Sequence, residues 1–547
     1  MNLRLLFIIF YMLCYHHVMA KDYYVHPTLG NDTNNGLSKE FPLKTLSSIS
    51  ELKLKAGDRI LLASNQLYKN GMHLIGQKGT RDNPILVTTV PWNSLEFIKP
   101  AMIDFKAKPY GILIQDCSFI EVSNLNLTAD GFLIDENQNM RCGILVKNNH
   151  ATAMENILIK NIKINDVYYE NFGYKRGHEE VRTANGTQKY GWGIRVINET
   201  KGLIKDVRIL NCSISNVSHT GIKLTGNAKN ISDVIIANNF IKKTGGPGIQ
   251  MSEVKNVFVN HNNITHSGSH DDSRKWGRGS GLWTWGSSHV LIEKNKFLYA
   301  NGPGDSAGAH IDFNCDNIVI QYNISAYNAG GFCEILGNNY NCAYRYNISI
   351  NDGHRVKGVN GAFQEGKILW LSGYQGSNKE RKGPVNSYFY NNTIYNDASM
   401  VSKMAIDNTS KGILIANNIF YLEGTSKAVL GDQYKPDKKS GDVAQQVFFK
   451  NNVFLNKNNW PKEIGINDVS PIYGNPEFVN KGGINIEDYM PTNYDLIKHR
   501  GIDIPLLPND HFGLLQTLKL KTDILGNTIN GNPSLGAIEP ILISNEN

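Results

Sequence analysis

The fold is decided by one repeated phrase, which reads VIIANNF at residues 234–240, VFVNHNNI at 257–264 and VLIEKNKF at 290–297. The phrase returns as IVIQYNIS at 318–325, ILIANNIF at 413–420 and VFFKNNVF at 447–454. Each copy places an asparagine just after a short β-branched run. The recurring asparagines are Asn124, Asn161, Asn211, Asn238, Asn262, Asn295, Asn323, Asn347, Asn391, Asn417 and Asn451. Their spacing is mostly about 24 to 34 residues. Strand-type segments at such a period, without helices between them, predict an all-β solenoid, the single-stranded parallel β-helix.

Composition is consistent with one large solenoid. The chain has 547 residues, of which 41% are hydrophobic and 19% charged, so it does not resemble a disordered protein. Its 25 Tyr and 7 Trp suit a surface that stacks on flat ligands. The formal charge of +7 fits an anionic substrate only weakly, and no basic run argues for nucleic acid.

Residues 1–20 read as a cleavable signal peptide. Arg4 supplies the charge, residues 5–13 the apolar core and Val18, Met19 and Ala20 the cleavage site. The apolar run is too short to span a bilayer, so we expect no stable membrane insertion. The sequence therefore predicts a secreted or periplasmic protein, which we expect to be a monomer.

Six cysteines remain after residue 20: Cys117, Cys142, Cys212, Cys315, Cys333 and Cys342. None has the spacing of a zinc site. Export permits disulfides, but isolated cysteines in a β-helix favour buried thiols, which we predict here.

The domain organisation follows from where the repeat begins and ends. Residues 21–56 contain KTLSSISELK, a short amphipathic segment, and are predicted to form an N-terminal helical cap over the open end of the solenoid. The β-helix should occupy residues 57–475. Residues 476–547 lose the repeat and are expected to pack along the solenoid or cap it.

Each repeat divides into three strands: one before the asparagine, one after it, and a third that usually starts at glycine. The third strand reads GILIQ at 111–115, GILVK at 143–147, GIRVI at 193–197, GIKLT at 221–225, GIQMS at 248–252, GLWTW at 281–285 and AHIDF at 309–313. Because side chains alternate between faces, Ile222 and Leu224 should point inward and Lys223 outward. The same register directs outward Arg195, Gln250, Trp283, Trp285, His310 and Asp312. Glu334 is expected outward in the next turn, since burying its carboxylate would be costly.

The connection between the second and third strands varies in length. It is short in KTGGP and long in residues 265–280, 298–307 and 350–367, and a further insertion occupies residues 168–192. These insertions fall at one corner of the solenoid, so we expect them to form a wall beside the third-strand sheet. Long loops on a rigid scaffold commonly carry function.

Asp312 and Glu334 are the predicted catalytic pair. Adjacent rungs lie about 4.8 Å apart, so a spacing of 22 residues should make the two carboxyl groups near neighbours. Two carboxyl groups about 5 to 5.5 Å apart suit a retaining glycosidase, and proximity separates their pKa values. The alternative is that one of them merely pairs with Lys223, Arg355 or another cation of the loops.

Other residues are predicted to assist catalysis or to bind substrate. Asp305 could be a third acid or a turn cap, and His310 could assist proton transfer or be structural. Trp283 and Trp285 could stack on sugar or lie under the loop that contains Trp276. The remaining predicted substrate-binding residues are Lys223, Arg195, Gln250, His270, Asp272, Arg274, His354 and Arg355. Asp271 and Asp272 could hold a calcium ion, but a solvated loop is the preferred interpretation, and we expect no cofactor.

These features together resemble the right-handed parallel β-helix carbohydrate-active enzymes of the pectate-lyase-like group. The opening YYVHPTLGNDTNNGLSKEFPLKTL and the closing PSLGAIEP look like the ends of exported bacterial members. The segment HIDFNCDNIVIQYNISAYNAGGFCEILG, residues 310–337, is similar in layout to β-helix β-xylosidases. That resemblance implies Asp312 as nucleophile and Glu334 as acid/base. The paired Asp, GHG and RIK signatures of polygalacturonases are absent from the sequence.

The sequence therefore predicts an exported, retaining glycoside hydrolase that acts on a plant or algal polysaccharide or its oligosaccharides. A polysaccharide lyase that acts on uronates by β-elimination is the second interpretation, with Lys223 as base. A non-catalytic carbohydrate-binding or adhesin β-helix is the third.

Overall fold

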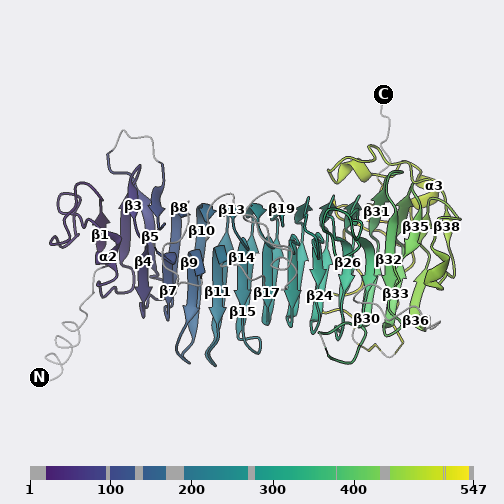
Figure 1. The fold of residues 1–547 in the computed structure, drawn as a ribbon, viewed down its shortest axis with the longest axis horizontal. Helices are drawn as coiled ribbons and strands as arrows, with labels where there is room; N and C mark the ends of the chain where they lie inside the picture. Colours follow the sequence, from purple (N-terminus) through teal and green to yellow (C-terminus); the bar gives the residue numbers. More distant parts are fainter. Residues whose placement is uncertain are drawn as a thin grey trace, which may run out of the picture.

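The structure is a computed structural model that describes residues 20–93, 99–106, 108–129, 140–167, 190–268, 278–376, 378–430, 444–508, 510–511 and 513–540. Strands stack side by side along the long axis of the molecule, from the N-terminal end to the C-terminal end (Figure 1). Every pairing between named strands in this part of the chain is parallel, and consecutive turns pair with each other. The predicted parallel β-helix is confirmed. Residues 1–19, to which the signal peptide was assigned, lie outside the described part.

A 12-stranded sheet, which we call sheet B, contains the third strand of each turn. Its strands are β4 (Met72–Ile75), β7 (Tyr110–Gln115), β9 (Met140–Asn148), β11 (Tyr190–Asn198), β14 (Ile222–Thr225), β17 (Ile249–Ser252), β20 (Leu282–Trp285), β23 (Ala309–Ile311), β26 (Gly331–Ile335), β29 (Lys367–Leu371), β32 (Ser402–Ile406) and β35 (Ser426–Ala428).

A 26-stranded sheet, sheet A, combines the two other faces, because the long strands β8 and β10 belong to both. The first face contains β1 (Asp22–Val25), β2 (Arg59–Ala63), β5 (Ile85–Val90), β8 (Ile120–Ala129), β10 (Met154–Val167), β12 (Ile204–Leu210), β15 (Ile231–Ala237), β18 (Val254–Asn260), β21 (Ser288–Glu293), β24 (Asp316–Gln321), β27 (Ala343–Arg345), β30 (Val385–Tyr390), β33 (Lys411–Ala416) and β36 (Gln446–Lys450). The second face contains β3 (Leu67–Lys69), β6 (Ala101–Asp104), β8, β10, β13 (Ser213–Val217), β16 (Phe240–Thr244), β19 (Asn263–Ser267), β22 (Lys296–Leu298), β25 (Ile324–Ala326), β28 (Ile348–Ile350), β31 (Thr393–Asn396), β34 (Ile419–Leu422), β37 (Val453–Phe454) and β38 (Ile472–Tyr473).

The asparagine ladder lies inside the corner between the two faces of sheet A. Asn262 donates from its backbone nitrogen and from Nδ2 to Oδ1 of Asn295, each at 2.9 Å, and Asn295 repeats both contacts on Asn323 at 2.9 and 3.0 Å. The buried ladder runs through Asn239, Asn262, Asn295, Asn323, Asn347, Asn392, Asn418 and Asn452. It satisfies amide groups that burial would otherwise penalise.

Part of the predicted ladder was displaced by one residue. Asn238, Asn391, Asn417 and Asn451 each precede a ladder residue and adopt left-handed φ angles of 57°, 52°, 57° and 60°. Asparagine tolerates that conformation better than most residues. In these four doublets the first asparagine turns the chain and the second stacks in the interior.

A column of glycines lies at the start of successive strands of sheet B. A Cβ added to Gly221 would lie 2.7 Å from the carbonyl oxygen of Gly248, and one added to Gly248 would lie 2.7 Å from that of Gly281. The same close approach recurs from Gly281 to Gly308, at 2.4 Å. Only glycine permits this backbone packing, which explains why the third strand so often starts at this residue.

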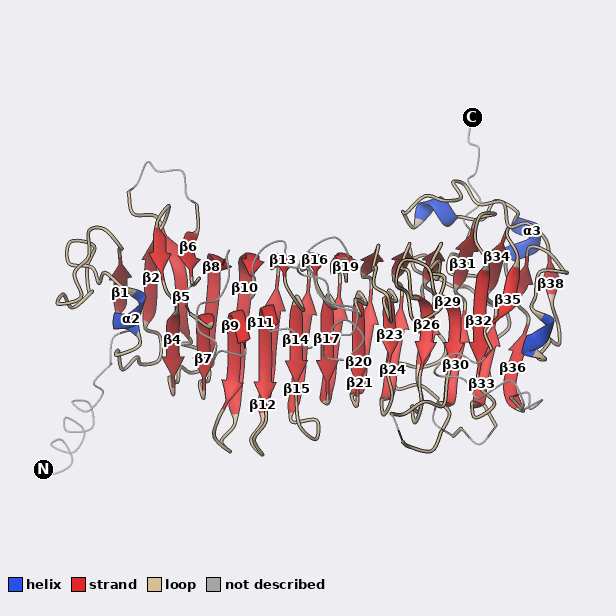
Figure 2. Cartoon of the chain, in the orientation of Figure 1, coloured by secondary structure: helices blue, strands red, loops and turns tan. Residues whose placement is uncertain are grey.

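Helices in the described part are short and lie near the two ends (Figure 2). They are α2 (Leu46–Ile49), η1 (Lys462–Ile464), η2 (Glu487–Tyr489) and α3 (Tyr494–Ile497). No helix in these residues is long and apolar enough to cross a membrane. The six predicted thiols are all buried and unpaired, so that prediction is confirmed.

The C-terminal segment packs back onto the solenoid. Tyr388 donates its hydroxyl to Asp510 at 2.6 Å and Tyr390 to the carbonyl of Leu518 at 2.7 Å. Arg345, fully buried on the same face, donates to Gln321 at 2.8 Å and to the carbonyl of Thr517. These contacts cover an outer face of sheet A and leave sheet B as the face that the wall loops border.

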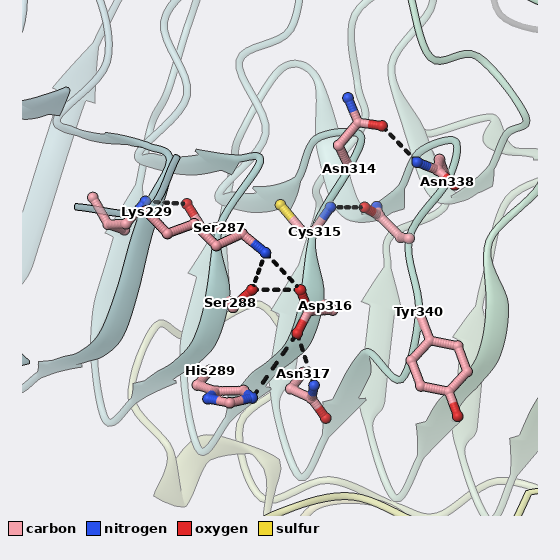
Figure 3. Close-up of polar contacts among 12 residues, drawn as sticks. Lys229, Ser287, Ser288, His289, Asn314, Cys315, Asp316, Asn317, Asn338 and Tyr340 are labelled. Atoms are coloured by element: carbon pink, nitrogen blue, oxygen red, sulfur yellow. Dashed lines mark hydrogen bonds and ion pairs between the residues drawn. The ribbon is translucent and has the colours of Figure 1, made fainter. Parts of the chain in front are cut away.

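A second polar cluster fixes the corner where the chain passes from sheet B to sheet A (Figure 3). Asp316 accepts hydrogen bonds from Ser288, from Lys229 at 2.9 Å and from Asn317 at 2.9 Å. Nearby, Asn338 donates to Asn314 at 2.8 Å. These contacts tie successive corners together and place β24 and the strands beside it.

Candidate active site

One column of side chains runs along the outer face of sheet B. Lys223 pairs with Gln250, Gln250 with Trp283, and Trp283 with His310. Further along, Glu334 pairs with Trp370. The outward direction predicted for these strands agrees with this register, and Trp370 joins the same column.

The register between β23 and β26 differs from the prediction. Ile311 pairs with Ile335, so Glu334 lies beside His310, and Asp312 lies one outward position further along its strand. The true spacing is 24 residues, the same as the step from Asn323 to Asn347 in the ladder. Asp312 and Glu334 are therefore diagonal neighbours, roughly 8 Å apart at Cα given the strand spacing and rise.

Asp305 joins these two acids from the loop before β23. Its φ of 41° is left-handed, and Ser306 follows at 63°. The backbone nitrogen of Asp305 donates to Oε1 of Gln364 at 2.7 Å, and its carboxylate lies 3.5 Å from Nη1 of Arg278. The loops that precede β20, β23 and β29 thus combine to place one carboxylate.

Arg355, which was predicted to bind substrate, is buried and contacts the backbone of this loop. It is 8% exposed, and it donates to the carbonyls of Gly302 and Asp305 at 2.9 Å each and of Gln364 at 2.8 Å. Because its guanidinium donates to backbone oxygens of two loops at once, Arg355 holds these loops together. His354 is exposed beside it.

The three carboxyl groups differ in charge state. Burial raises the pKa of Glu334 well above its usual range, and the charges of Asp305 and Asp312 raise it further. Burial raises the pKa of Asp312 to about 7, although the Phe313 N–H opposes this shift. For Asp305, burial is outweighed by Arg278, His310, Arg355 and Gln364, so its pKa falls below the ordinary value. Near neutral pH the site therefore favours an ionised Asp305 and a protonated Glu334, while Asp312 is divided between its two forms.

His310 is held neutral at the centre of the column. Burial lowers its pKa to about 4, against the opposing charge of Asp305, and its side chain is 2% exposed. Its Nδ1 lies 3.1 Å from the hydroxyl of Ser280, and its ring stacks on Trp283 with 6.1 Å between centroids and 6° between planes. A neutral imidazole has one donor and one acceptor nitrogen, so with Nδ1 beside Ser280 the tautomer decides whether Nε2 donates or accepts.

Aromatic side chains border the acids on several rungs. Trp283 and Trp285 are both half-buried, and Trp285 meets Phe313 edge-on at 6.0 Å. Phe313 in turn meets Tyr374 at 5.9 Å. Trp370 is buried, with Nζ of Lys367 3.5 Å from its ring centroid. Such surfaces suit the apolar faces of sugar rings.

Lys223, Gln250 and Arg195 lie on the N-terminal side of Trp283. Lys223 and Arg195 are half-buried, and Gln250 is 3% exposed. The guanidinium of Arg195 lies 4.2 Å from the ring centroid of Trp192, and Nζ of Lys223 lies 5.9 Å from the same centroid. The structure thus brings the predicted binding residues of sheet B into one continuous surface with the acids.

Several predicted residues lie outside the described part: His270, Asp271, Asp272, Arg274 and Trp276. In the described ranges no three His, Cys, Asp or Glu side chains converge as metal ligands would. Sequence reasoning missed Arg278, Ser280 and Gln364. Their only signal was their place in the long insertions at one corner.

The comparisons with known proteins support this fold. Residues 192–364 match a family model described as the right handed beta helix region. A lacto-N-biosidase of Bifidobacterium longum subsp. longum is 24% identical over 630 aligned positions, which cover 95% of this chain and 36% of that protein. The chain thus spans about a third of the length of this curated relative.

Two solved structures share the fold at low identity. A GH136 lacto-N-biosidase from Eubacterium ramulus is 18% identical with a TM-score of 0.51, covering 75% of this chain and 67% of that one. A complex of XylC with xylose is 12% identical with a TM-score of 0.52, covering 95% and 98%. The chain is a right-handed parallel β-helix of the kind found among carbohydrate-active enzymes.

Proposed function

We propose that the chain is a glycoside hydrolase that acts on oligosaccharides. The observation that carries the proposal is the group of three carboxyl side chains in unlike charge states, on a sheet face lined with tryptophan. Glycoside hydrolysis requires one carboxyl group that gives a proton and one carboxylate that attacks or activates water.

In the proposed mechanism Asp312 is the nucleophile and Glu334 the acid/base, as the sequence predicted. An Asp312 oxygen bonds to the anomeric carbon while the glycosidic C–O bond breaks, and Glu334 transfers its proton to the leaving oxygen. Water then attacks the anomeric carbon, gives its proton to Glu334 and releases Asp312. The neighbouring negative charges favour the protonated form of Glu334 before the first step.

A second division of roles rests on Asp305. Its carboxylate is the one held ionised by nearby cations, which is the state that a nucleophile or a general base needs. In that version Asp305 and Asp312 form the working pair, with Asp312 protonated, and Glu334 tunes their charge. Trapping the glycosyl-enzyme intermediate and mapping the labelled peptide distinguishes the two versions.

The relatives indicate which substrates to test first. The curated relative is a lacto-N-biosidase, so an aryl lacto-N-bioside is the first substrate, and an aryl xyloside is the second. We further propose that the chain is exported through residues 1–20, acts as a monomer and needs no metal.

The test measures released aglycone and the anomeric form of the product by NMR at early times. Retention supports the mechanism above, and inversion replaces it with direct attack by water. Products that absorb in the ultraviolet would identify a lyase instead. Loss of turnover in folded Asp312→Asn and Glu334→Gln variants supports a catalytic protein over a binding β-helix.

A further inference from the structure

The column of sheet B continues beyond the aromatic pair into a cationic stretch. Lys223, Gln250, Trp283 and His310 occupy successive rungs. At about 4.8 Å per rung, Lys223 lies roughly 14 Å from His310 along the column. That span is a few sugar units long, so a ligand chain that reaches the carboxyl cluster can also reach Lys223.

Lys223 has no acceptor within the described ranges. Its ammonium forms no hydrogen bond or ion pair there, and its recorded neighbours are Arg195 and the Trp192 ring. Burial and then the charge of Arg195 lower its pKa to about 7. An ammonium group in such a place is costly unless it is paired, and no described residue pairs it, so an anionic group of a ligand would stabilise it.

Gln250 presents a second unsatisfied group on the next rung. Its Oε1 is buried and forms no hydrogen bond, and the side chain is 3% exposed. A buried amide oxygen without a donor costs about 1 to 3 kcal/mol. A ligand that carries an anionic oxygen for Lys223 and a hydroxyl for Gln250 would satisfy both groups together.

The charges of the neighbouring elements favour an anion over a neutral group. On β11 the charged side chain is Arg195, on β14 it is Lys223, and β17 contributes the neutral Gln250. Tyr110 on β7 and Cys142 on β9 also lie near Arg195, and burial raises the pKa of both groups. The ring of His219 lies 5.9 Å from that of Trp192. The two charged side chains named on these strands, Arg195 and Lys223, are both cationic, and each charge is felt by the other.

We infer that Lys223 and Gln250, supported by Arg195, form a subsite for an acidic sugar, which carries a carboxylate or a sulfate ester. The inference rests on the proposed function only in placing a sugar chain along this face. Binding of the anion would hold Lys223 charged, so affinity is full below pH 7 and declines as pH rises above it.

The test measures binding without turnover, in the full chain carrying Asp312→Asn. Calorimetry compares glucuronate and galacturonate with their methyl esters, and galactose 6-sulfate with galactose. At least one acid should bind about tenfold or more tightly than its neutral partner, as charge-assisted hydrogen bonds imply. Lys223→Met should abolish that preference, whereas Lys255→Met, on an exposed lysine of sheet A, should leave it unchanged.

A second readout follows Lys223 itself. The full chain is treated with an amine-reactive reagent at pH 7, and modification of Lys223 is then quantified by mass spectrometry of the peptide that contains it. The modification should slow when the preferred acid is present. The inference is overturned if no acid is preferred over its neutral partner, or if the preference persists in Lys223→Met. Neither result depends on hydrolysis, so failure of the proposed function and failure of this subsite are distinguishable.

Discussion

The backbone nitrogen of Asp305 donates to the side-chain oxygen of Gln364 at 2.7 Å, although 59 residues separate them in the chain. Gln364 lies in the loop before β29, and Arg355 of the same loop binds the carbonyl of Asp305 at 2.9 Å. One wall loop therefore fixes the backbone of another, and through it the position of a carboxylate of the candidate site.

Replacement of Arg355 by Lys should lower kcat about 10- to 100-fold with little change in KM, because the fork that holds both loops is lost while the charge remains. Steady-state kinetics on the best aryl glycoside measures the effect. The control is Arg59→Lys, at an exposed ion pair with Asp22 far from the site. A purely structural role for Arg355 predicts a lower melting temperature with unchanged kcat in the surviving folded protein, and would contradict this account.

Asp312→Asn should reduce kcat by about 1,000-fold or more, since an amide neither attacks the anomeric carbon nor exchanges a proton. The matched control is Asp316→Asn, four residues later, where the carboxylate serves the corner contacts of Figure 3. Activity of Asp316→Asn should stay within a few-fold of the parent. Equal losses in both variants, with both folded, would assign the effect to structure.

The pH dependence of kcat/KM should be bell-shaped. Asp312 must be ionised to attack, and its pKa is about 7, so activity falls as pH drops through 7. Glu334 must keep its proton, and its pKa is raised by burial, so activity falls again as pH rises through that raised pKa. Glu334→Gln should remove the alkaline limb, and an activated aryl leaving group should restore part of the rate. An alkaline limb that survives in Glu334→Gln would assign the acid to another residue.

The asparagine ladder should be costly to interrupt. Asn295→Ala leaves the backbone N–H and Nδ2 of Asn262 without their acceptor and frees the carbonyls of Val259 and Glu293. The expected loss is about 2 to 4 kcal/mol of unfolding free energy, measured by denaturant titration. Asn458→Ala, at an exposed position, should change stability by less than about 0.5 kcal/mol. Similar small effects in both variants would show that the ladder contributes little.

Stability should fall between pH 5 and pH 8, partly because of Asp352. This residue is fully buried, accepts from Asn328 at 2.9 Å and from Ser349 at 2.8 Å, and burial raises its pKa to about 7. A carboxyl with a raised folded pKa stabilises the fold below its unfolded pKa, and that contribution is lost as pH rises through 7. Asp352→Asn should raise the melting temperature more at pH 8 than at pH 5. No difference between the two pH values would contradict the shift.

The sequence was sufficient for the fold because the repeat is periodic. Alternation along GIKLT and GLWTW correctly directed Lys223 and Trp283 outward, since a strand fixes its facing by its own register. Asp312 and Glu334 were predicted to lie on adjacent rungs of one face, but their relative register was wrong by two residues. The prediction placed Asp312 and Glu334 at the same position on adjacent strands, 22 residues apart. In the structure Ile311 pairs with Ile335, which is the 24-residue step of the ladder.

The contacts between the long insertions could not be predicted from the sequence. Arg355 was predicted as a substrate-binding residue of a long insertion. Its burial against the carbonyls of Gly302 and Asp305 depends on how two insertions fold together. Neither insertion has a period, so nothing in the pattern of either one encodes the contact. Gln364 was overlooked for the same reason.

The glycine column at the start of sheet B has an engineering consequence. Gly248 and Gly281 hold consecutive strands close together, and Gln250 stays paired with Trp283 although the connection before Gly248 is short and the one before Gly281 is long. Loop length is thus uncoupled from strand registration. Grafting a different insertion ahead of one of these glycines should alter which substrate the protein binds while leaving the neighbouring strands in register. The specificity of the solenoid can therefore be changed one turn at a time.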